Sequence, residues 1–159
     1  MIAMTLYTTY LESAIGPLAI SGTAAGITAV TFASQAGDSP AELPACLQVC
    51  RQQLAEYFAG SRTEFSLPLV MAGTPFQQQV WQTLLGIPFG QTRSYRELAA
   101  ILDKPRAVRA VGRANGANRI NIIIPCHRVV GADGSLTGYG GGLERKEWLL
   151  RHEQKIAGD

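Results

Sequence analysis

A cysteine followed directly by a histidine, Cys126–His127, is the part of this sequence best suited to covalent chemistry. The thiolate is the nucleophilic form of cysteine, and nearby positive charge lowers the pKa of a thiol from about 8.5. The apolar residues 122–124 predict a strand, and Pro125 ends it because proline cannot donate to a sheet ladder. We therefore expect Cys126 at the end of a strand, ionised and next to cationic side chains, with His127 as its base.

A histidine base needs a partner that orients its ring. Three carboxylates downstream of His127 are candidates for this role: Glu144, Glu147 and Glu153. All three belong to a predicted helix over 143–153, and their spacing alone does not choose among them.

Two other interpretations of Cys126 stay open at this point. A single cysteine beside a strand is commonly an inert residue of the core. A zinc site would need about four ligands, and the remaining cysteines and histidine are Cys46, Cys50 and His152. Cys46 and Cys50 lie four residues apart on a predicted amphipathic helix, with Cys50 in the core. Since the sequence also has no cofactor motif, we expect neither a metal nor a cofactor.

The basic side chains are concentrated around the Cys–His pair. The whole chain has a formal net charge of only +2, yet residues 93–128 hold eight of the 14 basic groups against two acidic ones. Clustered arginine is typical of proteins that bind a polyanion, although an ordinary solvated helix face is the alternative. The eight groups are Arg93, Arg96, Lys104, Arg106, Arg109, Arg113, Arg119 and Arg128.

The elements that must position these residues carry clear boundary signals. Thr74–Pro75 is an N-cap followed by proline at the first helical position. Ser94–Glu97 is a capping box and predicts a second helix. A short turn over 103–105 then leads to a third helix over 106–115. This half of the chain is therefore predicted to be mostly helical.

The second and third of these helices resemble a helix-turn-helix of winged-helix type. Ala107 and Ala110 keep the third helix slim, so that it can approach a nucleic-acid groove closely. Arg109 could then reach into the groove. Plain core packing of small residues is the alternative for this pattern.

The first half of the chain predicts a small α/β unit with an antiparallel sheet. Its short β-branched and aromatic segments are separated by glycines, and a helix with apolar residues at helical spacing follows. The predicted strands are 5–11, 17–21, 27–33 and 63–67, and the helix is 45–59. With a linker at 71–73, we expect an α+β fold with an N-terminal domain over 1–70 and a C-terminal domain over 71–159.

Composition supports a folded protein of the cell interior. The 159 residues are 47% hydrophobic and 16% charged, which excludes a disordered chain. No apolar run reaches the roughly 20 residues that a membrane span needs, and the N-terminus lacks the pattern of a signal peptide. Three cysteines are too few for a disulfide scaffold and fit a reducing compartment, so we expect a cytoplasmic location.

Four sequence blocks together resemble one known family. They are Pro-Cys-His-Arg-Val at 125–129, Arg-Ala-Val-Gly-Arg-Ala-Asn-Gly-Ala-Asn at 109–118, Gly-Tyr-Gly-Gly-Gly at 138–142 and Lys-Glu-Trp-Leu-Leu at 146–150. This combination is similar to the O6-alkylguanine-DNA alkyltransferases, also called methylated-DNA–protein-cysteine methyltransferases. The similarity runs from about Gly73 to Glu153, whereas the N-terminal part is similar only in its general layout.

The resemblance implies a protein that reverses DNA alkylation directly. Cys126 would take the alkyl group from O6-alkylguanine, and from O4-alkylthymine, irreversibly and once per molecule. His127 would take the thiol proton through a bridging water and would be held by Glu153, while Asn118 orients segments around the site. The implied partner is alkylated double-stranded DNA, bound in the minor groove by a monomer.

The resemblance also assigns the DNA contacts and the pocket. Arg109 would fill the gap left by the flipped guanine, and Tyr95 would crowd the phosphate and donate a proton to the departing base. The other implied DNA-binding residues are Arg106, Ala107, Ala110 and Arg113. The implied pocket residues are Val129, Tyr139, Gly140 and Gly141.

Three other functions compete with this reading. A lesion sensor of the same family would bind alkylated guanine without transfer, but such relatives lack the cysteine that this chain retains. A transcriptional regulator would need an extra metal-binding domain for which the chain has no room. A Cys–His hydrolase would need an oxyanion hole, and the arginine cluster would go unexplained.

Overall fold

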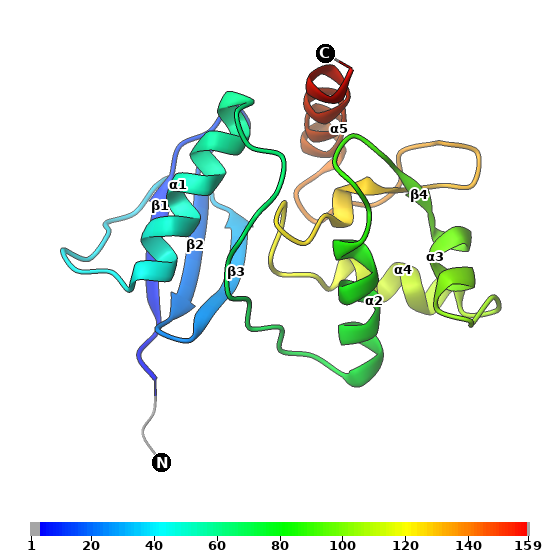
Figure 1. Cartoon of the computed structure of the whole chain (residues 1–159), viewed down its shortest axis with the longest axis horizontal. Coiled ribbons are helices and arrows are strands. Elements are labelled where there is room, and N and C mark those ends of the chain that lie inside the picture. The colour runs from blue at the N-terminus through cyan, green and yellow to red at the C-terminus, as the bar shows by residue number, and fades with distance from the viewer. Residues whose placement is uncertain (1–3, 159) are drawn as a thin grey trace. The chain divides into compact units, whose positions relative to one another are not determined.

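The computed structural model describes residues 4–158, and the chain divides into two compact units with the boundary after Met71. The first unit combines an antiparallel sheet with one helix, and the second is mostly helical (Figure 1). The expected α+β fold class is therefore confirmed. Within residues 4–158, no helix combines the length and the apolar character that crossing a membrane requires.

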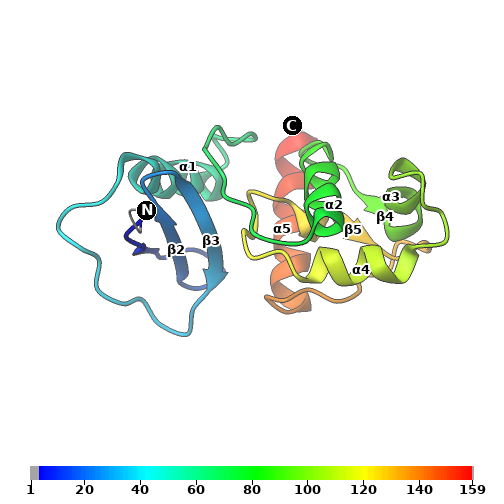
Figure 2. The same cartoon turned by 90° about the horizontal axis from the view of Figure 1, so that it is seen from below.

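The first unit is a three-stranded antiparallel sheet with one covering helix. Strands β1 (Tyr7–Leu11), β2 (Leu18–Thr23) and β3 (Gly26–Phe32) lie in the order β1-β2-β3. Helix α1 (Ala45–Ala59) lies across one face of this sheet (Figures 1 and 2). The three predicted strands of this sheet and the helix are confirmed. The fully buried core between sheet and helix includes Leu18, Ile20, Val30, Leu47, Leu54 and Tyr57.

The fourth strand predicted for this unit, over 63–67, is wrong. The amide side chain of Gln53 on α1 occupies both backbone groups of Ser66: its Oε1 accepts from Ser66 N at 3.0 Å and its Nε2 donates to Ser66 O at 3.2 Å. These groups are therefore not available for a ladder. Just after this segment, Leu69 forms one isolated parallel bridge with Ile27.

The second unit surrounds a two-stranded parallel sheet with helices. Strand β4 (Arg93–Ser94) pairs with β5 (Val129–Val130). The helices are α2 (Pro75–Leu85), α3 (Tyr95–Ile101), α4 (Val108–Gly116), the 3-10 helix η1 (Cys126–Arg128) and α5 (Leu143–Ala157). Helix α4 packs on α2 and α3, and η1 packs on α5. Both predicted helix starts, at Thr74 and Ser94, are confirmed as complete capping boxes.

A short turn joins α3 to α4. Asp103 in this turn has a φ of 58°, a left-handed conformation that aspartate tolerates better than most residues. Helix α4 starts at Val108, two residues after the predicted start. Its C-terminal end is fixed by Trp81, whose indole Nε1 donates to Ala114 O at 2.8 Å. Packing of α4 on α2 and α3 leaves Arg109 and Arg113 exposed.

Candidate active site

Cys126 lies at the start of η1, and residues 122–124 form turns, so the strand predicted over 122–124 is wrong. Two tight turns precede the thiol. Ile123 N donates to Asn121 O at 2.8 Å around Ile122, which has a φ of 73°. Cys126 N donates to Ile124 O at 2.8 Å around Pro125. Both are three-residue turns, and the first is of the rare, strained type. Because these turns use local backbone groups, the apolar segment folds on itself rather than pairing with a strand.

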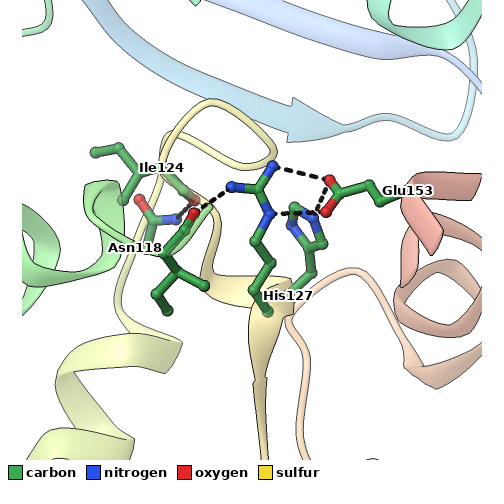
Figure 3. Close-up of polar contacts among 6 residues, drawn as sticks. Asn118, Ile124, His127 and Glu153 are labelled. Atoms are coloured by element: carbon green, nitrogen blue, oxygen red, sulfur yellow. Dashed lines mark hydrogen bonds and ion pairs between the residues drawn. The ribbon is translucent and has the colours of Figure 1, made fainter. Parts of the chain in front are cut away.

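A buried cluster of three charged or titratable side chains follows the thiol. His127 Nε2 lies 2.7 Å from Glu153 Oε2, and both side chains are at most 1% exposed. Arg128 Nε donates to Glu153 Oε1 at 2.7 Å, and its Nη2 donates to Oε2 at 3.1 Å. Arg128 Nη1 also donates to Ile87 O at 2.6 Å. Figure 3 shows Glu153 reaching from α5 to His127. Of the three candidate carboxylates, Glu153 is thus the one in contact with His127.

The protonation states in this cluster follow from burial and pairing. Burial alone would raise the pKa of Glu153, but the hydrogen bonds and charges of His127 and Arg128 hold this pKa well below its ordinary 4.5. Burial lowers the pKa of His127 below its ordinary 6.5, against the opposing effect of Glu153. At neutral pH the imidazole is therefore neutral. Since an ionised carboxylate only accepts, His127 Nε2 carries the proton and Nδ1 is the basic nitrogen.

Nδ1 of His127 is available to take a proton. Among residues 4–158 it is buried and has no hydrogen-bond partner. A buried nitrogen lone pair without a partner is unusual and calls for an explanation. The structure therefore leaves a basic nitrogen free on the residue that directly follows Cys126.

The Cys126 thiol is protonated at neutral pH in the protein without DNA. The side chain is only 4% exposed, and this burial raises the pKa of the thiol from its ordinary 9.0 to about 11. The Asn118 side chain and the charge of Lys146 lower this pKa without offsetting the burial. The thiol Sγ lies 3.7 Å from Asn121 Oδ1, to which it donates. Nearby positive charge was correctly expected, but desolvation outweighs it.

This protonation state predicts the pH dependence of a simple alkylation. The rate at which iodoacetamide modifies Cys126 should rise with pH throughout pH 7–10, because the reactive thiolate is a small fraction below the pKa of about 11. Peptide mass spectrometry after quenching gives the rate for Cys126 alone. A rate that is already constant above pH 7 would show an ionised thiol and contradict this protonation state.

Asn118 fastens the turn that carries Cys126. Its Nδ2 donates to Ile124 O at 2.9 Å (Figure 3). The same Nδ2 donates to Ile120 O at 3.3 Å, while Oδ1 accepts from Ile120 N at 2.9 Å. On the α4 side, Asn115 Nδ2 donates to Cys126 O at 3.4 Å. Two buried asparagines from the end of α4 and the residues after it thus hold the backbone on both sides of the thiol.

The predicted pocket residues lie on β5 and on the segment between β5 and α5. Val129 is fully buried, and Cys126 is close enough to Tyr139 to contribute to the pKa of its hydroxyl. Burial, with a smaller contribution from Cys126, raises the pKa of Tyr139 well above 10.0. Gly140 is exposed, and a Cβ added to it would have nothing within 4 Å. This segment therefore offers one buried aromatic side chain and, next to it in the chain, open backbone at Gly140.

The predicted DNA contacts lie on α4 and next to it. Arg106, Arg109 and Arg113 are exposed, while Ala107, Ala110 and Tyr95 are partly exposed. Ala107 is the N-cap of α4 rather than a helical residue. Exposed arginines with small residues between them form a surface that a phosphate backbone could approach closely.

Three residues of the site were not predicted from the sequence. Arg128 was counted with the arginine cluster, but it is 6% exposed and paired with Glu153. Lys146 is fully buried, and Asn121 touches the thiol. The sequence does contain a signal that Lys146 is buried. Residues 146, 149, 150 and 153 follow helical spacing, and this buried face of α5 includes two charged side chains.

Comparisons with known proteins agree with this site. The family model described as 6-O-methylguanine DNA methyltransferase, DNA binding domain, matches residues 75–155. The model of the ribonuclease-like domain of the same methyltransferase matches residues 6–71. A methylated-DNA–protein-cysteine methyltransferase of Methanosarcina barkeri is 45% identical over 156 residues, covering 94% of this chain and 98% of the relative. The protein of the same name from Mycobacterium tuberculosis is 47% identical over 152 residues, covering 92% of each chain.

Solved structures give the same result. A crystal structure of the Mycobacterium tuberculosis O6-methylguanine methyltransferase has a TM-score of 0.86 at 45% identity, covering 96% of this chain and 94% of that one. A structure of the Mycobacterium tuberculosis protein in complex with DNA has a TM-score of 0.84 at 47% identity, covering 92% of each chain. With both units matched and relatives similar over nearly their full length, the chain belongs to the O6-methylguanine-DNA methyltransferase family.

Proposed function

We propose that this protein repairs alkylated DNA by moving the alkyl group from O6 of guanine to Sγ of Cys126. The observation that carries the proposal is that Cys126, His127 and Glu153 are all buried, with Glu153 bonded to His127. The free Nδ1 of His127 belongs to the residue that directly follows Cys126. Relatives that are named methylated-DNA–protein-cysteine methyltransferases support it. O4-alkylthymine offers the same kind of electrophilic carbon and is proposed as a second substrate.

The proposed step is one displacement at carbon. The Sγ–C bond forms as the C–O6 bond breaks, and the bonding electron pair stays with the guanine. The proton of the thiol passes through one water to His127. The guanine gains a proton from the Tyr95 hydroxyl, and His127 then returns a proton to the Tyr95 oxygen through solvent. The product is a thioether, which has no easy route back, so each molecule reacts once.

The raised thiol pKa gives His127 a specific role. At rest the thiol is protonated, which protects it from other electrophiles. Ionisation must then coincide with the binding of the lesion, when a neutral Nδ1 can accept the proton. Glu153 keeps the imidazole in the required tautomer, and Lys146 supplies positive charge near the sulfur as the thiolate forms. We propose Asn118 as the residue that holds the thiol in line for this attack.

DNA is proposed to bind across α4 through the minor groove. Arg106 and Arg113 are suited to phosphate contacts, and Ala107 and Ala110 let the helix approach closely. Arg109 would occupy the space of the guanine that swings out toward Val129, Tyr139, Gly140 and Gly141. Because all proposed contacts come from one chain, a monomer suffices, and genomic DNA as substrate favours a cytoplasmic protein.

Replacing Arg109 with alanine should slow repair of a lesion in a duplex about 10- to 100-fold. Flipping costs a few kcal/mol in a duplex and least in a single strand, and each 1.4 kcal/mol is tenfold. The same lesion in a single strand should be repaired within about three-fold of the wild-type rate. Single-turnover repair rates on both substrates check this. The control is Arg151→Ala, an exposed arginine paired with Glu147 on α5, which should change neither rate. Equal slowing on both substrates would contradict a role in flipping.

A stoichiometric transfer assay tests the proposed function. DNA with a radiolabelled methyl group on guanine O6 is incubated with excess protein, and the label in protein is counted after the DNA is digested. We expect the label to move to protein, up to one methyl per chain, with unmodified guanine left in the DNA. Label that stays in DNA despite tight binding would favour the lesion sensor. Label released as methanol would favour the hydrolase.

A further inference from the structure

A chain of contacts joins the buried core of α5 to the proposed proton donor. Lys146 Nζ donates to Thr137 O at 2.6 Å and to Val129 O at 2.6 Å. The hydroxyl of Thr137 in turn donates to Tyr95 OH at 3.2 Å. Thr137 belongs to the segment between β5 and α5 (orange in Figure 1), and Tyr95 is the first residue of α3. Thr137 therefore links two parts of the site that are 42 residues apart.

Lys146 gives the Thr137 backbone a fixed position. The lysine side chain is fully buried, and within residues 4–158 no carboxylate forms an ion pair with it. A buried ammonium is costly unless its donors are satisfied. The two carbonyls that satisfy it lie at the two ends of the turn over 130–136, so they draw these ends together. Thr137 is exposed, but its backbone is anchored from inside.

Tyr95 is held from a second side by α4. A Cβ added at Gly112 would lie 3.8 Å from Cδ1 and Cε1 of the Tyr95 ring, so the ring passes directly over this part of α4. Thr137 and Gly112 thus limit the movement of the Tyr95 ring from two directions. Because Thr137 donates and Tyr95 accepts, the phenolic proton is not used in this bond. It remains available for a substrate.

We propose that Thr137 is a positioning residue for Tyr95. It holds the phenolic oxygen in a fixed position, leaves the phenolic proton for the departing guanine, and stabilises the negative charge that develops on this oxygen as the proton leaves. Lys146 anchors Thr137 in the orientation that this contact requires. The inference rests on the proposed function, because it needs a leaving group that must be protonated.

The test compares Thr137→Val, which removes the hydroxyl at nearly constant shape, with Thr137→Ser, which keeps it. We expect Thr137→Val to slow single-turnover methyl transfer from O6-methylguanine in DNA about five-fold, the value of one modest hydrogen bond. Thr137→Ser should react at the wild-type rate. Cys126 methylation by methyl iodide should be unchanged in both, because iodide leaves without a proton. Thr83→Val removes a hydroxyl bonded within α2 and is the matched control.

A double-mutant cycle separates positioning from a merely structural effect. In a Tyr95→Phe background the phenolic oxygen is absent, so adding Thr137→Val should change the rate by less than about 1.5-fold. A further five-fold loss in that background would overturn the proposal, as would a wild-type rate for Thr137→Val. Failure of the wild-type protein to transfer any methyl would instead overturn the proposed function.

Discussion

Replacing Cys126 with serine is expected to lower methyl transfer by more than about 1,000-fold while DNA binding is retained. The serine hydroxyl is a far weaker nucleophile at carbon, and His127 cannot ionise it fully. Binding is retained because the proposed DNA contacts lie on α4 and next to it, and α4 keeps its packing on α2 and α3. Transfer is measured by single-turnover label counting, and binding by the fluorescence anisotropy of a labelled duplex.

Cysteine replacements in the first unit provide the control for this experiment. Cys46 is partly exposed and donates to Thr23 O, and Cys50 lies in the core. Cys46→Ser should transfer methyl at the wild-type rate, since it lies outside the unit that carries the site. If Cys126→Ser still takes up label, another residue is the acceptor, and the role of the Cys–His pair is contradicted.

Replacing Glu153 with glutamine is expected to have the largest effect on stability. The carboxylate holds Arg128 through two hydrogen bonds and His127 through one, all buried. Glutamine leaves the buried guanidinium without a counter-charge, and breaking a buried ion pair in this way costs about 3–5 kcal/mol. Urea unfolding, followed by circular dichroism, measures the loss. Transfer should also fall, because the imidazole of His127 is no longer held in one tautomer.

A matched variant on the same helix isolates the effect of burial. Glu147 pairs with Arg151 at 2.6 Å, and these side chains are 47% and 78% exposed. Glu147→Gln should change the free energy of unfolding by less than about 0.5 kcal/mol. Equal losses for Glu147→Gln and Glu153→Gln would contradict the structural importance of the buried cluster.

The same cluster sets the acid limit of stability. The folded pKa of Glu153 lies below its ordinary 4.5, so its contribution is fully present above pH 4.5 and is lost as the pH falls toward the folded value. His127 acts in the same direction, because a folded pKa below 6.5 means that the unfolded chain binds the proton more readily. The wild-type free energy of unfolding should therefore decrease as the pH falls below 6.5. In Glu153→Gln, the free energy of unfolding should decrease less steeply at low pH, because the variant lacks the carboxylate that titrates there.

Local sequence signals predicted most of the elements. The capping boxes at Thr74 and Ser94 depend only on residues three positions apart, and helix α1 was predicted with its observed bounds. These features are decided by near neighbours in the chain. The strand over 63–67 failed because a side chain distant in sequence, Gln53, takes the backbone groups of Ser66.

The site itself was only partly predictable. The Cys–His pair is visible in the sequence, but Glu153 was selected by family resemblance, since helical spacing allows other carboxylates. The state of the thiol depends on how many atoms cover it, which local charge does not reveal. Arg128 and Lys146 were missed as site residues because burial of a cation depends on acceptors that come from other elements, such as Ile87 O and Thr137 O.

Mass spectrometry of the peptide that contains Cys126 tests the central claim most directly. The wild-type protein is incubated at neutral pH with a slight excess of duplex DNA that carries O6-methylguanine, then digested. The account predicts that this peptide gains the mass of one CH2 group, that the gain stops at one per chain, and that the Cys46 and Cys50 peptides are unchanged. An unchanged Cys126 peptide, in a protein that binds the DNA, would contradict it.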